Sequence, residues 1–512
     1  MEALIFMFDV ACMTYLCWRV YKLDPKHPRP DDLGYFQYRT ACTTPRPRPN
    51  RRRAKAMDRA RGVPVRDLFF ALAMLALVPL AFLRPFNAYM LWGWTSAMIP
   101  TGFLFGFMAS ARVNFIFAGI TLLLVVLRRV DWSQYRFNWA VALYLVFLLH
   151  ATIAWLTGYG GNGNNAKYYD ILMKGLIFSM LMPMFVQSRM HMHMMLLVVV
   201  FGLGLHGMIE GLKTVVSGGS HNMYGPAGSM LYDRNHLSTA LAMVLPIAYY
   251  LYLHSVHRFA RWGFLALFVI IVLAIMGGGS RGGFVALAVV AFWLILTSRH
   301  RWRTLFIVAA LGLLLWQFVP DSVVSRLETI GEANEDDSFM GRVHAWKISS
   351  ALALEHPFFG GGFHAVQVQY VWEQFKTAPS LLDFLNMPPP EFVLAKAAHS
   401  VYFEVMGDLG FLGLFLYLLI FSMPLLARFS VKRMATRLGP DFVWARDLGD
   451  MLMLAVMAYL VGGAAVSVAY LEVAYLMVML MAVLQVHLRQ RLSEHERAQA
   501  RASRATYVGG AA

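Results

Sequence analysis

Residues 262–297 read WGFLALFVIIVLAIMGGGSRGGFVALAVVAFWLILT and predict two helices that cross a membrane. Each half is an apolar run near the roughly 17–25 residues that one crossing takes. A glycine-rich turn, GGGSRGG at 277–283, separates the halves, and arginines flank their far ends at 258–261 and 299–303. Because loops rich in Lys and Arg are retained in the cytoplasm, the turn and its Arg281 are expected on the opposite face.

The same alternation extends in both directions along the chain. Basic loops at 128–136, 258–261, 299–303 and 428–446 can all lie on one cytoplasmic face. We therefore predict an all-α, polytopic membrane protein with about 12 transmembrane helices and both ends in the cytoplasm. The apolar segments fall near 68–84, 112–127, 138–157, 170–187, 193–212, 236–254, 262–278, 282–297, 304–319, 400–426, 449–468 and 471–488.

The apolar stretch 87–110 does not fit this alternation. Pro100 and Gly102 interrupt it, and such residues break a straight helix. The nine Lys and Arg residues at 46–66 stay cytoplasmic only if one crossing separates them from the 112–127 helix. We therefore predict a re-entrant or interfacial segment. A full crossing would give 13 helices and place those nine charges outside.

Composition agrees with the membrane class. Hydrophobic residues make up 58% of the 512-residue chain and charged residues only 14%. The formal net charge of +16 lies mostly in short segments between apolar runs, with no basic stripe interleaved with aromatics, so nucleic acid is not an expected partner. The three cysteines form no CxxC, and neither a disulfide framework nor a thiolate metal site is indicated.

This topology divides the chain into five regions. Residues 1–66 are predicted to be a disordered, basic cytoplasmic arm; the alternative is an upstream start codon, before Met57, that is not the natural one. Helices one to nine follow at 67–319, then a non-cytoplasmic loop at 320–398. Helices ten to twelve occupy 399–488, and a basic cytoplasmic tail occupies 489–512.

The loop at 320–398 carries ten Asp and Glu against five Lys and Arg, the reverse of the cytoplasmic loops. A loop of this length inside a compact protein usually serves a function. Within it we predict an amphipathic helix lying on the membrane domain, capped by residues 336–338. Its apolar face has helical spacing at Val343, Trp346, Ser350, Ala351 and Leu354.

Three arginines, Arg234, Arg281 and Arg342, are predicted on the non-cytoplasmic face, against the usual charge bias. Guanidinium binds two oxygens of a phosphate at once and stays charged, so a phosphate or diphosphate site is one interpretation. Glycines at 277–279 and 282–283 would let backbone N–H groups approach the same anion. Contacts with lipid headgroups are the alternative.

His399 closes the long loop at the start of the tenth crossing, with Tyr402 one turn later on the same face. A neutral imidazole near pH 7 can accept a proton from a hydroxyl nucleophile, or orient that nucleophile. An interfacial helix cap is the alternative. The chain has no P-loop, no GxGxxG at a strand–helix junction and no HExxH, so nucleotide-driven or metal-dependent chemistry is not indicated.

Five motifs follow one another along the chain: GPAGS at 225–229, SRGG at 280–283, GR at 341–342, PFFGGGF at 357–363 and HSVYFE at 399–404. They stand in the order seen in the O-antigen ligase/polymerase superfamily. RDL at 66–68 and RPF at 84–86 resemble a narrower group, the O-glycosylation ligases associated with exosortase systems. The resemblance covers roughly residues 66–490. Each motif is weak alone, and five in order are fairly specific.

The resemblance implies a GT-C-like, inverting and metal-independent glycosyltransferase in a bacterial inner membrane, with its active site facing the periplasm and no cofactor. It would pass a glycan from undecaprenyl diphosphate to a lipid or protein hydroxyl. His399 would activate or orient the acceptor, and Arg234, Arg281 and Arg342 would bind the diphosphate and stabilise its developing charge. The supporting candidates are Tyr402, Glu404 and Lys167.

Two other functions stay open at this point. A polymerase of the same superfamily would use the same diphosphate site and the same base, with another lipid-linked glycan as acceptor. A polysaccharide or lipid transporter would also have 12 crossings, but it predicts ionisable residues at mid-membrane and inverted repeats. The predicted membrane centres are nearly free of charge, and no repeat is evident.

Overall fold

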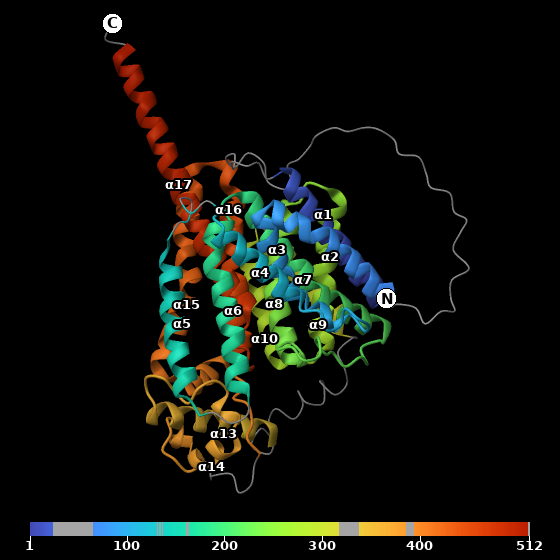
Figure 1. Cartoon of the computed structure of the whole chain (residues 1–512), viewed down its shortest axis with the longest axis vertical. Helices are drawn as coiled ribbons and strands as arrows, with labels where there is room; N and C mark the ends of the chain where they lie inside the picture. The colour runs from blue at the N-terminus through green and yellow to red at the C-terminus, as the bar shows by residue number, and fades with distance from the viewer. Residues whose placement is uncertain are drawn as a thin grey trace, which may run out of the picture. The chain divides into compact units, whose positions relative to one another are not determined.

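The computed structural model describes residues 1–23, 65–130, 132, 135, 137–159, 163–298, 300–316, 337–385 and 394–509, and its regular elements there are all helices (Figure 1). An α-helix coincides with each of the 12 predicted apolar segments. Eight helices in the described part are long and apolar enough to cross a membrane, and two more apolar helices are shorter. The all-α, polytopic class is therefore confirmed, whereas the number of crossings stays a prediction.

The first compact unit comprises Met1–Val130, Ser188–Leu205 and Ser255–Ala260. Its helices are α1 (Glu2–Leu23), α2 (Val65–Leu83), α3 (Pro85–Met98) and α4 (Val113–Val126), with the first part of α7 (Arg189–Val216). The expectation of a disordered arm is wrong for residues 2–23, because the apolar run there forms α1 and packs on α2. Residues 24–64 lie outside the described part.

Helix α1 is also held by buried polar contacts. Trp94 Nε1 donates to Asp9 Oδ2 over 3.0 Å, and Asn87 Nδ2 donates to the Cys17 carbonyl over 3.1 Å. Asp9 and Asn87 are both buried. A buried polar group without a partner is costly, so these two bonds fix how α1 sits on α3.

The break predicted in 87–110 is present. Helix α3 ends at Met98, Ile99 adopts a left-handed conformation with φ of 53°, and a 3-10 turn follows at Pro100–Gly102. Asp67 then holds the chain beyond the break by accepting from the backbone N–H groups of Phe105, Gly106 and Met108 over 3.3, 2.9 and 2.9 Å. Whether α3 re-enters or crosses stays a prediction.

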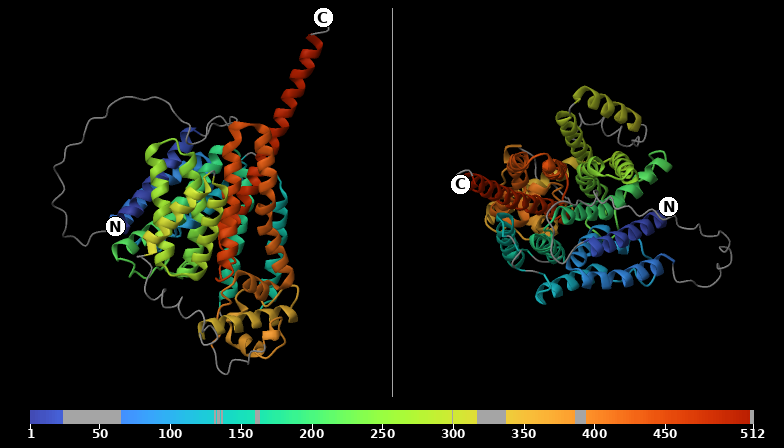
Figure 2. Two further views of the ribbon diagram at one scale, coloured as in Figure 1. Left: turned by 180° about the vertical axis from the view of Figure 1, so that it is seen from behind. Right: turned by 90° about the horizontal axis from the view of Figure 1, so that it is seen from above.

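The second unit comprises Asp131–Gln187, His206–His254 and Arg261–Ala512. Figure 2 shows its last long helices, orange to red, running side by side, as their mutual contacts also indicate. The helices are α5 (Trp139–Thr157), α6 (Asn164–Phe185), the end of α7, α8 (Arg234–His254), most of α9 (Arg258–Gly277), α10 (Arg281–Thr297), α11 (Arg301–Trp316), α15 (Val401–Leu438), α16 (Val443–Gly463) and α17 (Glu472–Gly509).

The long loop forms a small helical layer at one end of α5, α6 and α15 (Figure 1). It contains α13 (Asp337–Glu355), the 3-10 turn η5 (Ala365–Gln367) and α14 (Gln369–Phe375). The helix predicted in this loop is confirmed as α13, which packs on α15, but its amphipathic character is not, because no residue from Gly341 to Ala353 is exposed. The cap predicted at 336–338 involves side chains outside the described part.

The buried face of α13 is wider than predicted. Val343, Ser350 and Ala351 are buried as expected, but Leu354 is 45% exposed. The layer has its own core because α13 packs on α15 and α14 together, so a second stripe of residues is covered. That core consists of Ala345, Ile348, Ala351, Leu352, Ala365, Val366, Val368, Val371, Trp372 and Phe375.

Candidate functional site

The beginnings of α8, α10 and α15 gather around the glycine pair Gly462–Gly463 at the end of α16. A Cβ on Gly462 would lie 3.1 Å from both Thr239 of α8 and Ala286 of α10. A Cβ on Gly463 would lie 2.9 Å from Val401, the first residue of α15. Only glycine permits such close helix packing. The pair therefore brings three helix N-termini together, and each carries partial positive charge.

Two of the predicted arginines begin these helices. Arg234 is the first residue of α8 and is partly exposed, and Arg281 is the first residue of α10 and is exposed. Ser280 caps α10 by accepting from the Gly283 N–H over 3.1 Å. A Cβ on Gly283 would lie 2.7 Å from the Cβ of Ser238, one turn into α8. The two helix starts that carry Arg234 and Arg281 are thus neighbours.

Helix α13 brings the third arginine to the same end of the unit. Trp346 Nε1 donates to the Ala398 carbonyl over 2.6 Å, and its ring stacks on Phe403 with centroids 5.1 Å apart. Arg342 lies one turn before Trp346 on α13 and is partly buried. Because Ala398 directly precedes His399, Trp346 positions Arg342 and His399 together.

His399 occupies a strained position between the loop layer and α15. Its φ is 45°, a left-handed conformation that is uncommon outside glycine and that is often retained at functional sites. Burial, followed by the nearby charges of Arg342 and His236, lowers the pKa of His399, while Asp233 and Glu404 act in the opposite direction. The imidazole is therefore neutral at pH 7 and able to accept a proton.

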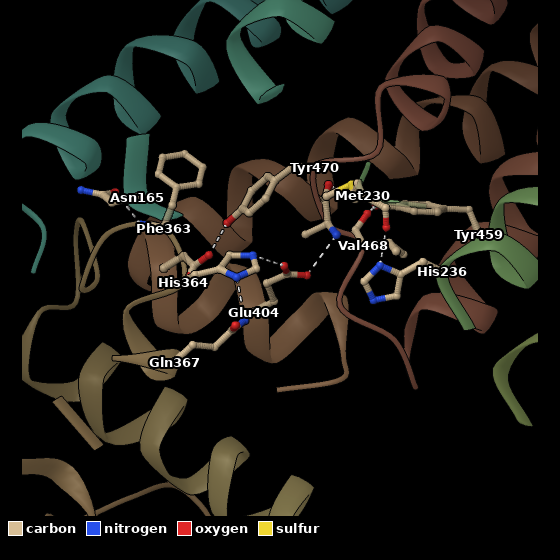
Figure 3. Close-up of polar contacts among 12 residues, drawn as sticks. Asn165, Met230, His236, Phe363, His364, Gln367, Glu404, Tyr459, Val468 and Tyr470 are labelled. Carbon is tan, nitrogen blue, oxygen red and sulfur yellow. Dashed lines mark hydrogen bonds and ion pairs between the residues drawn. The ribbon is translucent and has the colours of Figure 1, made fainter. Parts of the chain in front are cut away.

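His236 is a site residue that sequence reasoning missed. It lies in the first turn of α8, and its Nδ1 donates to the Met230 carbonyl over 2.7 Å (Figure 3). A carbonyl oxygen can only accept, so Nδ1 of His236 carries a proton. Asp233 precedes the helix and accepts from the Asn235 N–H over 2.7 Å. The sequence pattern did not single out His236. The one feature that could have done so is its position two residues after Arg234.

A second polar cluster, here called the buried triad, consists of His364, Glu404 and Asp408. Figure 3 shows His364 beside Glu404. His364 Nε2 lies 3.1 Å from Glu404 Oε1, and Glu404 Oε2 accepts from the Ala469 N–H over 3.0 Å. Tyr470 donates its hydroxyl to Asp408 Oδ2 over 2.8 Å. All three residues of the triad are at most 5% exposed.

The triad fastens the glycine turn of the loop layer to α15. The N–H groups of Gly361 and Gly362 donate to the carbonyls of Gly407 and Asp408, both over 2.9 Å. The turn cannot take side chains, because a Cβ on Gly360 would lie 2.5 Å from the Gly410 nitrogen. The sequence contained this signal in the PFFGGGF motif, but it did not link His364 to Glu404.

The supporting candidates have different positions. Glu404 belongs to the triad, and its charge also acts on His399. Tyr402 donates its hydroxyl to the Leu460 carbonyl over 2.9 Å, so it anchors α15 to α16. Lys167 is exposed on α6, with its Nζ 5.6 Å from the ring centre of Tyr168. Tyr168 stacks on His364, and this places Lys167 on the triad side of the unit.

Two family models match the chain. One, described as O-antigen ligase, matches residues 266–418. The other, a family of unknown function (DUF5935), matches residues 65–256. No curated protein matches the chain.

The segment that matches the O-antigen ligase model contains Arg281, Arg342, His399 and the whole triad, and the other matched segment contains Arg234 and His236. Ligand atoms of the triad lie within 4.8 Å of one another, a spacing that would suit a metal ion. Two of their oxygens accept hydrogen bonds, Glu404 Oε2 from the Ala469 N–H and Asp408 Oδ2 from Tyr470, whereas Glu404 Oε1 and His364 Nε2 face each other as an ion pair without a hydrogen bond. A paired acid–imidazole network with a positioning role explains this donor set.

Proposed function

We propose that the protein is a glycan ligase that transfers a glycan from undecaprenyl diphosphate to a hydroxyl of a lipid or protein acceptor. The reaction would be inverting and metal-independent and would take place at the periplasmic face of a bacterial inner membrane. The O-antigen ligase domain supports the coarser class, a glycan ligase or polymerase. The observation that carries the proposal is the placement of neutral His399 beside Arg342, at the gathered starts of α8 and α10.

The chemistry follows from the charges of these groups. The acceptor oxygen attacks the anomeric carbon, and its proton passes to His399 Nδ1 or Nε2. The bond between the anomeric carbon and the diphosphate oxygen breaks, and its electron pair stays on the diphosphate. Negative charge therefore grows on the leaving group, where Arg234, Arg281 and Arg342 would stabilise it. Attack from the side opposite the leaving group inverts the anomeric centre.

An in vitro transfer assay with a synthetic undecaprenyl-diphosphate glycan tests this proposal. We expect His399→Gln and Arg281→Ala each to lower kcat by about 100-fold or more, as removal of a transition-state donor does in other enzymes. Arg261→Ala is the matched control, because Arg261 is also exposed but packs over Tyr252 on α8. Wild-type rates in both site variants would refute the mechanism.

The same assay separates a ligase from a polymerase of the same superfamily. A ligase adds one donor glycan to each acceptor, so the product is a single species. A polymerase extends another lipid-linked glycan and yields a ladder of products. The acceptor needs its own test, such as loss of surface polysaccharide or of a glycoprotein in a deletion strain. Loss of a glycoprotein would support the narrower resemblance to exosortase-associated ligases.

A further inference from the structure

The segment between α7 and α8 is an ordered loop that presents two tyrosine rings. Glu210, buried near the end of α7, accepts from His221 Nε2 over 2.7 Å and from the Tyr224 N–H over 3.4 Å. The Gly225 N–H donates to the Tyr232 carbonyl over 3.0 Å, which closes the loop on itself. A Cβ on Gly225 would lie only 1.9 Å from the Leu231 carbonyl oxygen, so the two sides of the loop touch.

Tyr224 and Tyr232 stand side by side at the point where the loop closes. Their ring centroids are 5.6 Å apart with an interplanar angle of 28°, and the two residues are 55% and 50% exposed. The exposed pair is not core packing. Because the backbone hydrogen bond between Gly225 and Tyr232 holds this part of the loop in place, a ligand that contacts the two rings costs little conformational entropy of the loop.

The loop is tied to both helix starts that carry the predicted diphosphate arginines. Met223, the neighbour of Tyr224, is buried, and its methyl group would lie 2.7 Å from a Cβ on Gly278, three residues before Arg281. Tyr232 precedes Arg234 by two residues, at most about 8 Å along the backbone. The Met230 carbonyl accepts from His236 in the first turn of α8 (Figure 3).

We propose that Tyr224 and Tyr232 form a stacking platform for the sugar ring that is joined directly to the donor diphosphate. This inference rests on the proposed function. A pyranose ring presents C–H groups on its face, and these are attracted to the electron-rich face of an aromatic ring. A sugar one bond away from a phosphate bound at Arg234 lies within the short span that separates Arg234 from Tyr232.

The test compares binding of two ligands in nanodiscs, undecaprenyl diphosphate carrying a glycan and undecaprenyl diphosphate without sugar. We expect Tyr224→Ala and Tyr232→Ala each to raise Kd for the glycan-bearing ligand by roughly threefold to tenfold, which is the value of one aromatic contact. Binding of the sugar-free ligand should not change. Phenylalanine at either position should retain most of the affinity, because it keeps the ring face.

Tyr15→Ala is the matched control and should change neither Kd. Tyr15 is 50% exposed and pairs with Trp18 at 5.9 Å, but it belongs to α1 in the first unit. Equal weakening of both ligands by the tyrosine variants would overturn the platform, since it would indicate a contact with lipid or a distorted loop. Unchanged binding of both ligands, or equal affinity of wild type for the two, would overturn it as well.

Arg281→Ala separates this inference from the proposed function. If Arg281→Ala weakens both ligands while the tyrosine variants weaken neither, the diphosphate site stands and the platform fails. If Arg281→Ala weakens neither ligand while the tyrosine variants weaken the glycan-bearing one, the platform stands and the arginine site fails.

Discussion

Replacing His364 with Gln should loosen the loop layer from α15. Gln keeps a polar head but removes the positive charge 3.1 Å from Glu404 Oε1, and both residues are 5% exposed. Two unit charges at that distance interact with about 5 kcal/mol at an effective dielectric constant of 20. Breaking a buried pair by removing one partner costs about 3–5 kcal/mol, because the other charge stays buried. We therefore expect His364→Gln to lower the free energy of opening the loop layer by an amount in that range.

The pH dependence provides a second readout. Burial by itself lowers the pKa of His364, but the interaction with Glu404 and the charge of Asp408 outweigh it and raise the pKa above the ordinary value of a histidine. A raised folded-state pKa gives stabilisation that is complete below the unfolded value and is lost as the pH rises through the folded value. The wild-type layer should therefore loosen as the pH rises through the folded-state pKa of His364, and His364→Gln should lack the part of this response that His364 contributes.

Hydrogen exchange of the segment 357–368 in nanodiscs measures this opening, with thermal melting as a second probe. Lys376→Gln is the matched control, because Lys376 pairs with Glu373 in the same layer but on an exposed surface. It should leave exchange nearly unchanged. A double-mutant cycle with Glu404→Gln completes the test. If the effects of His364→Gln and Glu404→Gln simply add, the two residues are not coupled, and the positioning role of the triad is refuted.

Three further outcomes are expected. Arg342→Gln should move the acidic limb of the kcat–pH profile to higher pH, because Arg342 lowers the pKa of His399. Asp233→Asn should move that limb to lower pH, because Asp233 raises the same pKa. Shifts of both variants in the same direction would contradict these electrostatic effects. Gly360→Ala should destabilise the layer by about 1–3 kcal/mol in thermal melting, since its Cβ would meet backbone and its φ is +62°, whereas Gly119→Ala, with open space around it, should be tolerated. Transfer should persist in EDTA, and inhibition reversed by added metal would instead indicate an ion at the buried triad.

Much of the fold could be predicted from local pattern. Apolar runs and basic loops located all 12 predicted helical segments, because burial in lipid requires long apolar stretches whose backbone bonds are satisfied internally. Pro100 marked the break after α3, and helical spacing marked α13. The error at residues 2–23 arose because Asp9 interrupts the apolar run of α1, and the cost of burying Asp9 is offset by a bond from Trp94 far along the chain.

The candidate site divides in the same way. Arg281 and His399 stand next to glycine-rich or loop-closing motifs, so the sequence by itself determined their placement at helix starts. It did not determine which residues face them. His236, the Gly462–Gly463 pair and the bond from Trp346 to Ala398 depend on helices that are remote in sequence. Only tertiary packing decided these contacts, because side-chain periodicity specifies which face of a helix is buried but not which other helix covers it.

The glycine-rich turn at 277–283 shows what the sequence determines and what the tertiary structure decides. Its sequence alone indicated a tight turn with one exposed arginine between two apolar helices. The tertiary structure decided that Gly278 lies against Met223 of the tyrosine loop and that Gly282 lies against Gly462 of α16. The composition of the turn allows such close approach, and the partners that approach it are set by the packing of the whole helical unit.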